Sequence, residues 1–231
     1  MPGRRPRTLV RAGRDLVLGL VCVGCAEPGV LCCPGCRSAV AGAGRAVQRP
    51  GYDGSGAWLT VWTGGAWAGP LRAAVLAFKE HGATALEPLL GEQLGRLVSS
   101  APGAVGRDPP VLVPVPSRPG AARARGYDPV LRLARRAARR SGGRVVPLLH
   151  SRGGVADQVG LGLVARHRNV AGSMAVDHRL LRRLAAVAPR ARVLVVDDVV
   201  TTGATLVEAH RALGAVGVVP GHPVTLASAG D

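Results

Sequence analysis

Lysine is almost absent from this chain of 231 residues: Lys79 is the only one, although the formal net charge is +16. Arginine therefore supplies nearly all of the positive charge. Such a charge balance indicates a polyanionic partner or anionic substrates. Aromatic residues are also scarce, with a single Phe, and the excess of Arg, Ala, Gly and Val is typical of a GC-rich coding sequence. The charge therefore permits nucleic-acid binding without establishing it.

Long apolar runs are missing as well. A membrane-spanning helix needs about 18 uninterrupted apolar residues, and the chain has no such run, so we expect no membrane span. Residues 16–23 form a short apolar segment behind a basic terminus, but Asp15 and the lack of a small-residue cleavage site argue against a secretion signal. No G-x-x-x-x-G-K-[ST] motif is present, which argues against a P-loop nucleotide hydrolase. We therefore expect a cytoplasmic protein with one main domain and a small appendage.

Cysteine is absent beyond position 36, and all five cysteines lie between positions 22 and 36. The pairs Cys22-x-x-Cys25 and Cys33-x-x-Cys36 are two knuckles whose thiolates can close a tetrahedral Zn²⁺ site. A disulfide pair and a redox Cys-x-x-Cys are the alternatives, but clustering at one end favours structural zinc. The short interval between the knuckles leaves open whether Cys32 or Cys33 is the ligand. The sequence predicts a zinc-knuckle segment over residues 1–45 and a main domain over 46–231.

Strands and helices alternate along the rest of the chain. Short apolar runs rich in β-branched residues predict strands, and apolar residues at helical spacing predict helices. The Gly-rich segment 39–69 is expected to hold a linker and short strands. This order predicts an α/β fold with a parallel sheet flanked by helices. The predicted strands are 111–116, 144–149, 193–196 and 224–227, and 111–116 is expected to be the first of the main sheet. One predicted helix starts at Pro70 and stops near Gly82, and three more cover 85–98, 129–140 and 179–188. A last helix starts near Thr205.

The most informative segment is Val193–Thr205, which joins a buried strand to two carboxylates and a hydroxyl-rich turn. Asp197 and Asp198 follow the strand, and adjacent carboxylates can accept hydrogen bonds from a vicinal diol or hold a hydrated Mg²⁺. The turn that follows suits a phosphate, because it offers hydroxyl groups, close backbone approach and a helix N-terminus. Its residues are Thr201, Thr202, Gly203, Ala204 and Thr205.

Diol acceptors beside a phosphate cradle describe a ribose 5-phosphate site. The segment resembles the motif of type I phosphoribosyltransferases that binds phosphoribosyl pyrophosphate (PRPP). A buried strand that merely ends in solvated acids is the bland alternative. A response-regulator acid pair is another, but it would lack the Thr-Thr-Gly-x-Thr turn.

Basic residues gather in two further places. Arg118, Arg123 and Arg125 follow the strand 111–116 and have no nearby acid in sequence apart from Asp128. Guanidinium groups bind phosphate oxygens bidentately, so these arginines are candidates for a pyrophosphate or a nucleic-acid phosphate. The basic connection 152–170, which contains Arg166, could close over the ligand as a lid. Helix 129–140 carries five arginines on one face, either as ordinary amphipathicity or as a stripe for DNA: Arg132, Arg135, Arg136, Arg139 and Arg140.

The whole order of motifs is similar to the ComF family of competence-associated proteins. The resemblance rests on the cysteine knuckles, Lys79-x-x-Gly82, Pro114-Val115-Pro116, Arg125-Gly126-Tyr127, Gln158-x-Gly160-Leu161, Arg166-x-x-Asn169 and the PRPP motif. It implies a zinc-bearing phosphoribosyltransferase-like domain, linked in some relatives to uptake of single-stranded DNA. The chain departs from the family at Asp128, where Asn is usual, and at Ala165, where an acid is usual.

Three classes of function follow from these residues. The first is an enzyme that transfers phosphoribosyl from PRPP to a nitrogen acceptor, with Mg²⁺ and arginines assisting the loss of pyrophosphate. The second is an accessory in competence that binds single-stranded DNA, and the third is a PRPP-sensing regulator. The sequence nominates no general base and no acceptor, and it is silent on oligomeric state.

Overall fold

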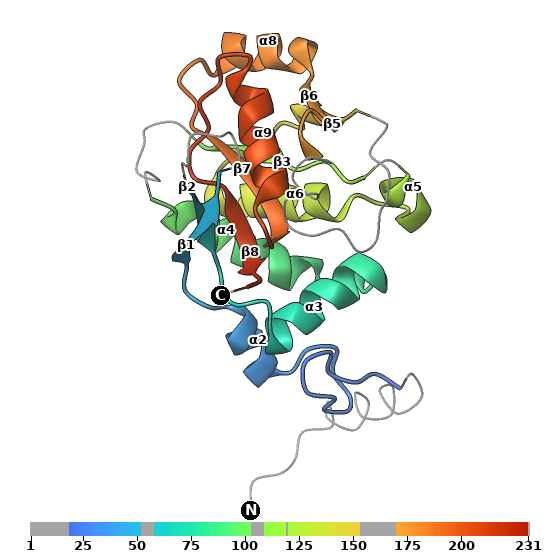
Figure 1. Cartoon of the computed structure of the whole chain (residues 1–231). Coiled ribbons are helices and arrows are strands. Elements are labelled where there is room, and N and C mark those ends of the chain that lie inside the picture. The colour runs from blue at the N-terminus through green and yellow to red at the C-terminus, as the bar shows by residue number, and fades with distance from the viewer. Residues whose placement is uncertain (1–18, 52–57, 103–108, 119, 153–169, 231) are drawn as a thin grey trace, which may run out of the picture.

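The described residues of the computed structural model are 19–51, 58–102, 109–118, 120–152 and 170–230. They form a central sheet of six strands in the order β1-β2-β8-β7-β3-β4 (Figure 1). β1 and β2 are antiparallel, and every other neighbouring pair in the sheet is parallel. The strands are β1 (Arg45–Pro50), β2 (Trp58–Thr63), β3 (Val111–Pro114), β4 (Arg144–Val145), β7 (Val193–Val200) and β8 (Val224–Ser228).

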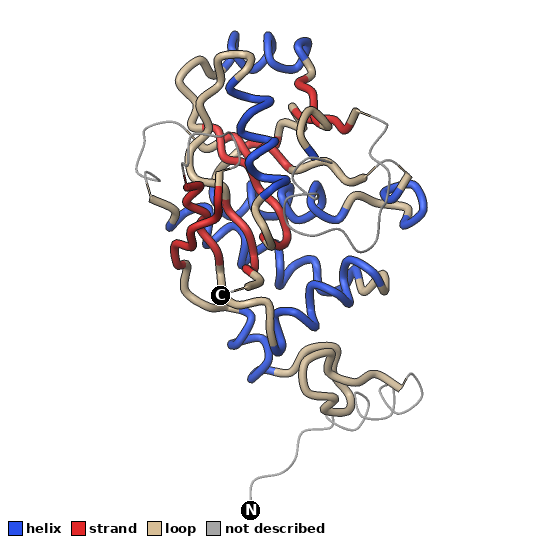
Figure 2. Tube along the Cα trace, viewed as in Figure 1, coloured by secondary structure: helices blue, strands red, loops and turns tan. Residues whose placement is uncertain are grey.

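Helices cover both faces of this sheet, and Figure 2 shows the red strands enclosed between blue helices. One face packs against α2 (Pro34–Val40), α3 (Gly69–Glu80), α4 (Glu87–Ser100) and α6 (Pro129–Ser141). The other packs against α8 (His178–Val187), α9 (Ala204–Gly214) and a small hairpin of β5 (Leu149–Ser151) and β6 (Met174–Val176). Short helical turns lie at η1 (Thr84–Leu86) and α5 (Ala121–Arg125). The predicted α/β fold with a mostly parallel sheet is confirmed.

Strand β7 is buried because it is apolar on both faces. Leu194 and Val196 pack into the core under α4 and α6, and Val193 and Val195 pack into the core under α9. Successive side chains of a strand point to opposite faces, so an unbroken aliphatic run suits a strand covered on both sides. This central position is what carries the acid pair into the interior.

Two strand predictions were wrong in detail. The predicted strand 144–149 splits, because Pro147 has no N–H to donate and ends the pairing with β3. Its second part becomes β5, which pairs with β6 outside the main sheet. The strand predicted at 111–116 ends at Pro114 and is not the first of the main sheet, because β1 and β2 precede it and β2 pairs with β8.

The helix predictions are confirmed with small shifts at their ends. Pro129 starts α6 behind Asp128, whose carboxylate accepts a hydrogen bond from Leu131 N at 2.9 Å, and Gly142 with φ 69° ends it. Such caps satisfy backbone groups that a helix leaves without partners. Among the described residues, no helix is long and apolar enough to cross a membrane.

Two glycines let α4 and α6 approach closely. A Cβ atom on Gly91 would lie 2.4 Å from Cβ of Arg136. One on Gly95 would lie 2.7 Å from Cβ of Arg140 and 3.0 Å from the carbonyl oxygen of Ala137. The 2.4 Å and 2.7 Å distances are shorter than real Cβ contacts, so something must shift if either glycine gains a side chain.

Replacing Gly95 by alanine should therefore destabilise the protein, although alanine is the better helix former by about 1 kcal/mol. We expect a net loss of about 1–3 kcal/mol in the free energy of unfolding from overpacking, measured by urea denaturation. The control is Gly214→Ala at the end of α9, where the added Cβ meets nothing within 4 Å and stability should stay unchanged or rise slightly. Stabilisation by Gly95→Ala would contradict the close approach.

Candidate functional site

The acid pair, Asp197 and Asp198, lies in β7 just beyond the point where the neighbouring strand β3 ends. β3 pairs with β7 only as far as Pro114 opposite Val196, whereas β8 continues to Val200. On the side of β8, Asp197 and Asp198 lie within the paired length of β7. On the side of β3, they lie beyond the last paired residue. The Asp197 carboxylate accepts a hydrogen bond from Asp198 N at 2.8 Å, and that of Asp198 accepts one from Val199 N at 2.9 Å. Both carboxylates are thereby fixed in orientation.

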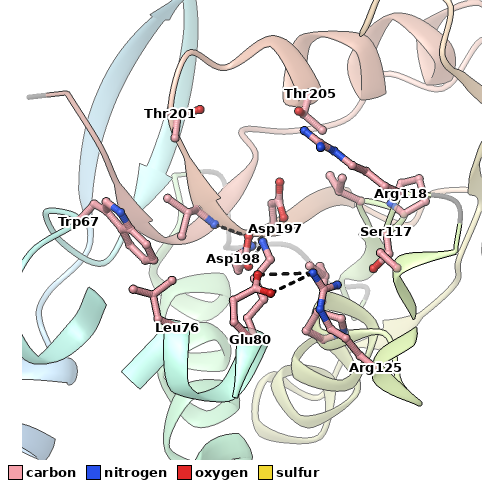
Figure 3. A pocket seen from close by; sticks show the side chains of 17 residues that line it. Trp67, Leu76, Glu80, Ser117, Arg118, Arg125, Asp197, Asp198, Thr201 and Thr205 are labelled. Carbon is pink, nitrogen blue, oxygen red and sulfur yellow. Dashed lines mark hydrogen bonds and ion pairs between the residues drawn. The ribbon is translucent and has the colours of Figure 1, made fainter. Parts of the chain in front are cut away.

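A cavity of about 510 Å³ opens at this point (Figure 3). Its wall brings together side chains from β7, from the turn that precedes α9 and from the segment after β3. The predicted site residues that line it are Asp197, Asp198, Thr201, Thr205, Arg118 and Arg125. The structure thus brings both predicted acids, two threonines of the turn and two loop arginines around one space.

Other predicted site residues take different places. The Thr202 hydroxyl accepts a hydrogen bond from Ala204 N at 3.3 Å, so it stabilises the turn and is absent from the cavity wall. Gly203, with φ 84°, is the N-cap of α9, and it is buried beside Ala204. Arg123 is exposed on α5 and does not line the cavity. Arg166 lies outside the described residues.

An acid that lies far away in the sequence comes close to the loop arginines in the structure. Arg125 forms an ion pair with Glu80 of α3, with 3.2 Å between Nη2 and Oε2. Figure 3 shows this pair on the cavity wall, with Arg118 on the same side of the acid pair. The sequence could not indicate the contact, because Glu80 lies far from Arg125 along the chain. Arg118 and Arg125 form the arginine wall of the cavity. The positive charge of this wall is therefore partly neutralised before any ligand binds.

Asp128 connects this wall to the helix behind it. One carboxylate oxygen caps α6 at Leu131 N, and the other accepts a hydrogen bond from Ser117 N at 3.3 Å. Asn and Asp are equally good helix N-caps. The departure from the family pattern at this position therefore leaves the capping role intact.

Lys79 is a residue of the cavity that sequence reasoning did not assign to the site. Its Nζ lies 2.6 Å from Oδ2 of Asp198, whose side chain is 4% exposed. Burial alone would lower the pKa of Lys79, but the Asp198 carboxylate more than offsets that and the pKa is raised. Burial, together with the charge of Asp198, also holds the pKa of Asp197 well above its ordinary value. The one lysine of the chain thus compensates an acid pair in which Asp198 is buried and Asp197 is half-buried.

Sequence reasoning also missed Arg49 of β1, which holds the threonine turn before α9 in place. Its guanidinium is buried and donates to the carbonyl of Thr201 at 2.8 Å, to the hydroxyl of Ser228 at 2.7 Å and to the carbonyl of Ala229 at 2.9 Å. A Cβ atom on Gly203 would lie 2.8 Å from Cβ of Arg49. The β1–β2 hairpin therefore fixes the turn against the end of β8.

We expect Arg49→Lys to lower the free energy of unfolding by about 1–3 kcal/mol, because lysine cannot serve these acceptors together and leaves buried oxygens without donors. Chemical denaturation measures the change. The matched control is Arg139→Lys on the exposed face of α6, which should shift stability by no more than about 0.5 kcal/mol. Equal denaturation midpoints for the two variants would contradict the role of Arg49.

The arginine stripe of α6 is only partly free. Arg132 pairs with Glu87 and Arg136 pairs with Glu92, both on α4. The members that remain exposed are Arg135, Arg139 and Arg140. Two of the five arginines therefore serve helix packing, which weakens the interpretation of this face as a DNA surface.

A second candidate site is the cysteine cluster at the end of the molecule beyond α2 and α3 (Figure 1). The Sγ atoms of Cys22, Cys25, Cys33 and Cys36 all lie within 4.8 Å of one another, so they could hold one metal ion such as zinc. Cys32 is outside this group, which answers the question of which neighbouring cysteine is the fourth member.

The backbone around Cys22 favours its thiolate, whereas burial and the neighbouring cysteines raise the pKa of Cys36. Burial opposes the charge on Cys22, but backbone N–H groups, with that of Cys33 donating to its sulfur at 3.3 Å, lower its pKa to about 6. A Cβ atom on Gly24 would lie 2.6 Å from Sγ of Cys36 and 3.0 Å from Cβ of Pro70. The first knuckle thus packs directly on the start of α3.

Zinc content tests this ligand set. Wild-type protein grown in zinc-replete medium should carry about one zinc per chain, and Cys36→Ser should lose most of it because three thiolates leave a tetrahedral site open. Cys32→Ser is the matched control and should keep its zinc. Elemental analysis decides the matter: zinc-free wild-type protein, or equal loss from both variants, would contradict the assignment.

Comparison of the chain with protein-family models and with curated proteins gave no match. The ComF resemblance therefore remains a prediction from the motifs.

Proposed function

We propose that the cavity binds PRPP or a related ribose 5-phosphate ester, and that the chain is a phosphoribosyltransferase-like protein of the ComF type. The observation that carries the proposal is the grouping of paired carboxylates, a threonine turn at a helix N-terminus and arginines around one space. Each group suits a different part of the same ligand: acids suit a diol, the turn suits a monophosphate and arginines suit a pyrophosphate.

The charges set the direction of the ligand. Carboxylates repel phosphate, so Asp197 and Asp198 face the ribose hydroxyls as hydrogen-bond acceptors. Thr201 and Thr205 line the cavity beside the N-terminus of α9, where free N–H groups attract the 5-phosphate. Arg118 and Arg125 lie on the other wall and suit the pyrophosphate. Mg²⁺, which PRPP carries, would neutralise the pyrophosphate charge as it leaves.

Transfer would break the bond between ribose C1 and the pyrophosphate oxygen and form a bond from C1 to an acceptor nitrogen, whose proton passes to solvent or to a base. The described cavity wall offers carboxylates and arginines, and with a ribose held at the acid pair those carboxylates would stabilise positive charge at the ribosyl centre. A PRPP-sensing regulator would use the same contacts without the transfer step. The structure favours PRPP recognition over a DNA-binding role, because the arginine face of α6 is partly paired.

Calorimetric titration tests the proposal. With Mg²⁺ present, wild-type protein should bind PRPP, and Thr205→Val and Arg118→Gln should each bind it roughly ten- to hundredfold more weakly, the effect of losing one charge-assisted contact. Arg118→Gln should affect ribose 5-phosphate much less than PRPP, because ribose 5-phosphate carries no pyrophosphate.

Arg123→Gln is the matched control, since Arg123 is exposed and outside the cavity, and its affinity should equal that of wild type. Wild-type protein that binds neither PRPP nor ribose 5-phosphate would sink the proposal. An Arg123 effect as large as that of Arg118 would place the pyrophosphate elsewhere.

A further inference from the structure

We propose that Lys79 is a built-in counter-ion of the acid pair, and that a divalent cation reaches Asp198 only by displacing the lysine ammonium. The inference deepens the proposed function and rests on it for the identity of the ligand. The competition between lysine and metal rests on the contacts that Asp198 makes with Lys79 and Val199. It makes Lys79 a positioning residue that decides when the site accepts a cation.

The hydrogen bonds of Asp198 leave little room for a metal. Its Oδ1 accepts from Val199 N at 2.9 Å, and its Oδ2 lies 2.6 Å from Nζ of Lys79. The side chain is 4% exposed, so it cannot turn outward to offer a further lone pair to a cation in solvent. A cation that binds Oδ2 from the cavity must take the place that the ammonium holds.

The charge balance leads to the same conclusion. Lys79 cancels the charge of the Asp198 carboxylate, and the raised pKa of Asp197 makes that acid harder to ionise, so the acid pair attracts a divalent ion only weakly while lysine is in place. If Lys79 stayed in place, a divalent ion would stand a few ångströms from an ammonium, and that repulsion is strong away from bulk water. Removing the lysine charge leaves the Asp198 carboxylate without a counter-ion, and a divalent ion can then take that place. A pyrophosphate ligand supplies the missing negative charge when lysine is present, so metal and ligand are expected to enter together.

Lys79 is able to move, and its neighbour holds the helix while it does. Its side chain is 33% exposed and lines the cavity, and a flexible four-carbon stem carries the ammonium. The ammonium can therefore turn from Asp198 toward a ligand anion. The next residue, Glu80, is paired with Arg125 of the opposite wall (Figure 3). The displacement therefore needs a new side-chain rotamer at the end of α3 and no movement of the helix.

The test is Mn²⁺ binding in the absence of PRPP, followed by electron paramagnetic resonance of the free ion. Lys79→Met keeps the length of the side chain without its charge, and it should bind Mn²⁺ at least about tenfold more tightly than wild type. Lys79→Arg keeps the charge and should behave as wild type. Adding Asp198→Asn to Lys79→Met should abolish the gain. An unchanged or weaker Mn²⁺ affinity of Lys79→Met would overturn the proposal.

Loss of Lys79 leaves a buried carboxylate unpaired, so stability needs its own measurement. The melting temperature of each variant is recorded with and without Mn²⁺, and Mn²⁺ should raise that of Lys79→Met more than that of wild type. An equal rise in both proteins would count against competition at Asp198, even if the variant is destabilised.

A final arm separates this inference from the proposed function. Because PRPP itself binds Mn²⁺, the reference is the same mixture of PRPP and Mn²⁺ without protein. Adding PRPP to wild type should increase the bound Mn²⁺ beyond the sum of this reference and the protein alone, because the ligand anion then pairs with the ammonium. If PRPP adds nothing beyond that sum while Lys79→Met still gains Mn²⁺, the ligand assignment fails and the counter-ion role stands. If PRPP binds but Lys79→Met gains nothing, the counter-ion role fails and the ligand assignment stands.

Discussion

Two adjacent carboxylates in the central strand of an apolar sheet are the constraint on which the rest of the site depends. An isolated charge is expensive to bury, so each acid needs a partner or a hydrogen bond that offsets desolvation. Backbone N–H groups of β7 serve one oxygen of each acid, and Lys79 serves the second oxygen of Asp198. α3 must therefore end where its last turn reaches β7, and Glu80 of the same turn reaches the arginine wall. The end of one helix thus joins two walls of the cavity.

The parts of the molecule that look like additions also support this region. The cysteine module packs on the start of α3 through Gly24 and Pro70, so a metal held there would stabilise the helix that carries Lys79. The β1–β2 hairpin supplies Arg49, which binds the turn before α9 and the end of β8. Both additions precede α3 in the sequence, and they support different parts of the cavity wall.

Sequence reasoning succeeded where the chemistry is local. The aliphatic run of β7, the acid pair and the threonine turn lie within one short segment, and the turn needs glycine at Gly203 for a positive φ that is visible in the pattern. The cysteine spacing likewise predicted the cluster, and distance resolved only the choice between Cys32 and Cys33. The β4 error was avoidable, because Pro147 interrupts the strand pattern.

The residues that were missed are those whose partners lie far along the chain. Lys79 belongs to a motif of the family resemblance but received no role in the site, Arg49 looks like an edge-strand arginine, and Glu80 looks like a solvated acid. Their roles depend on which strands and helices meet in space, which periodicity does not specify. The family name, the domain boundary near residue 45 and the lid role of Arg166 stay predictions, the last because it lies outside the described residues.

The central claim is that one cavity binds a ribose through the acid pair and a phosphate through the threonine turn. A crystal structure of the protein with PRPP and Mg²⁺ tests it most directly. The account predicts the 5-phosphate at the N-terminus of α9 against Thr201 and Thr205, the ribose hydroxyls at Asp197 and Asp198, and the pyrophosphate beside Arg118. Ligand density on another surface, or a phosphate group against the acid pair, would contradict it.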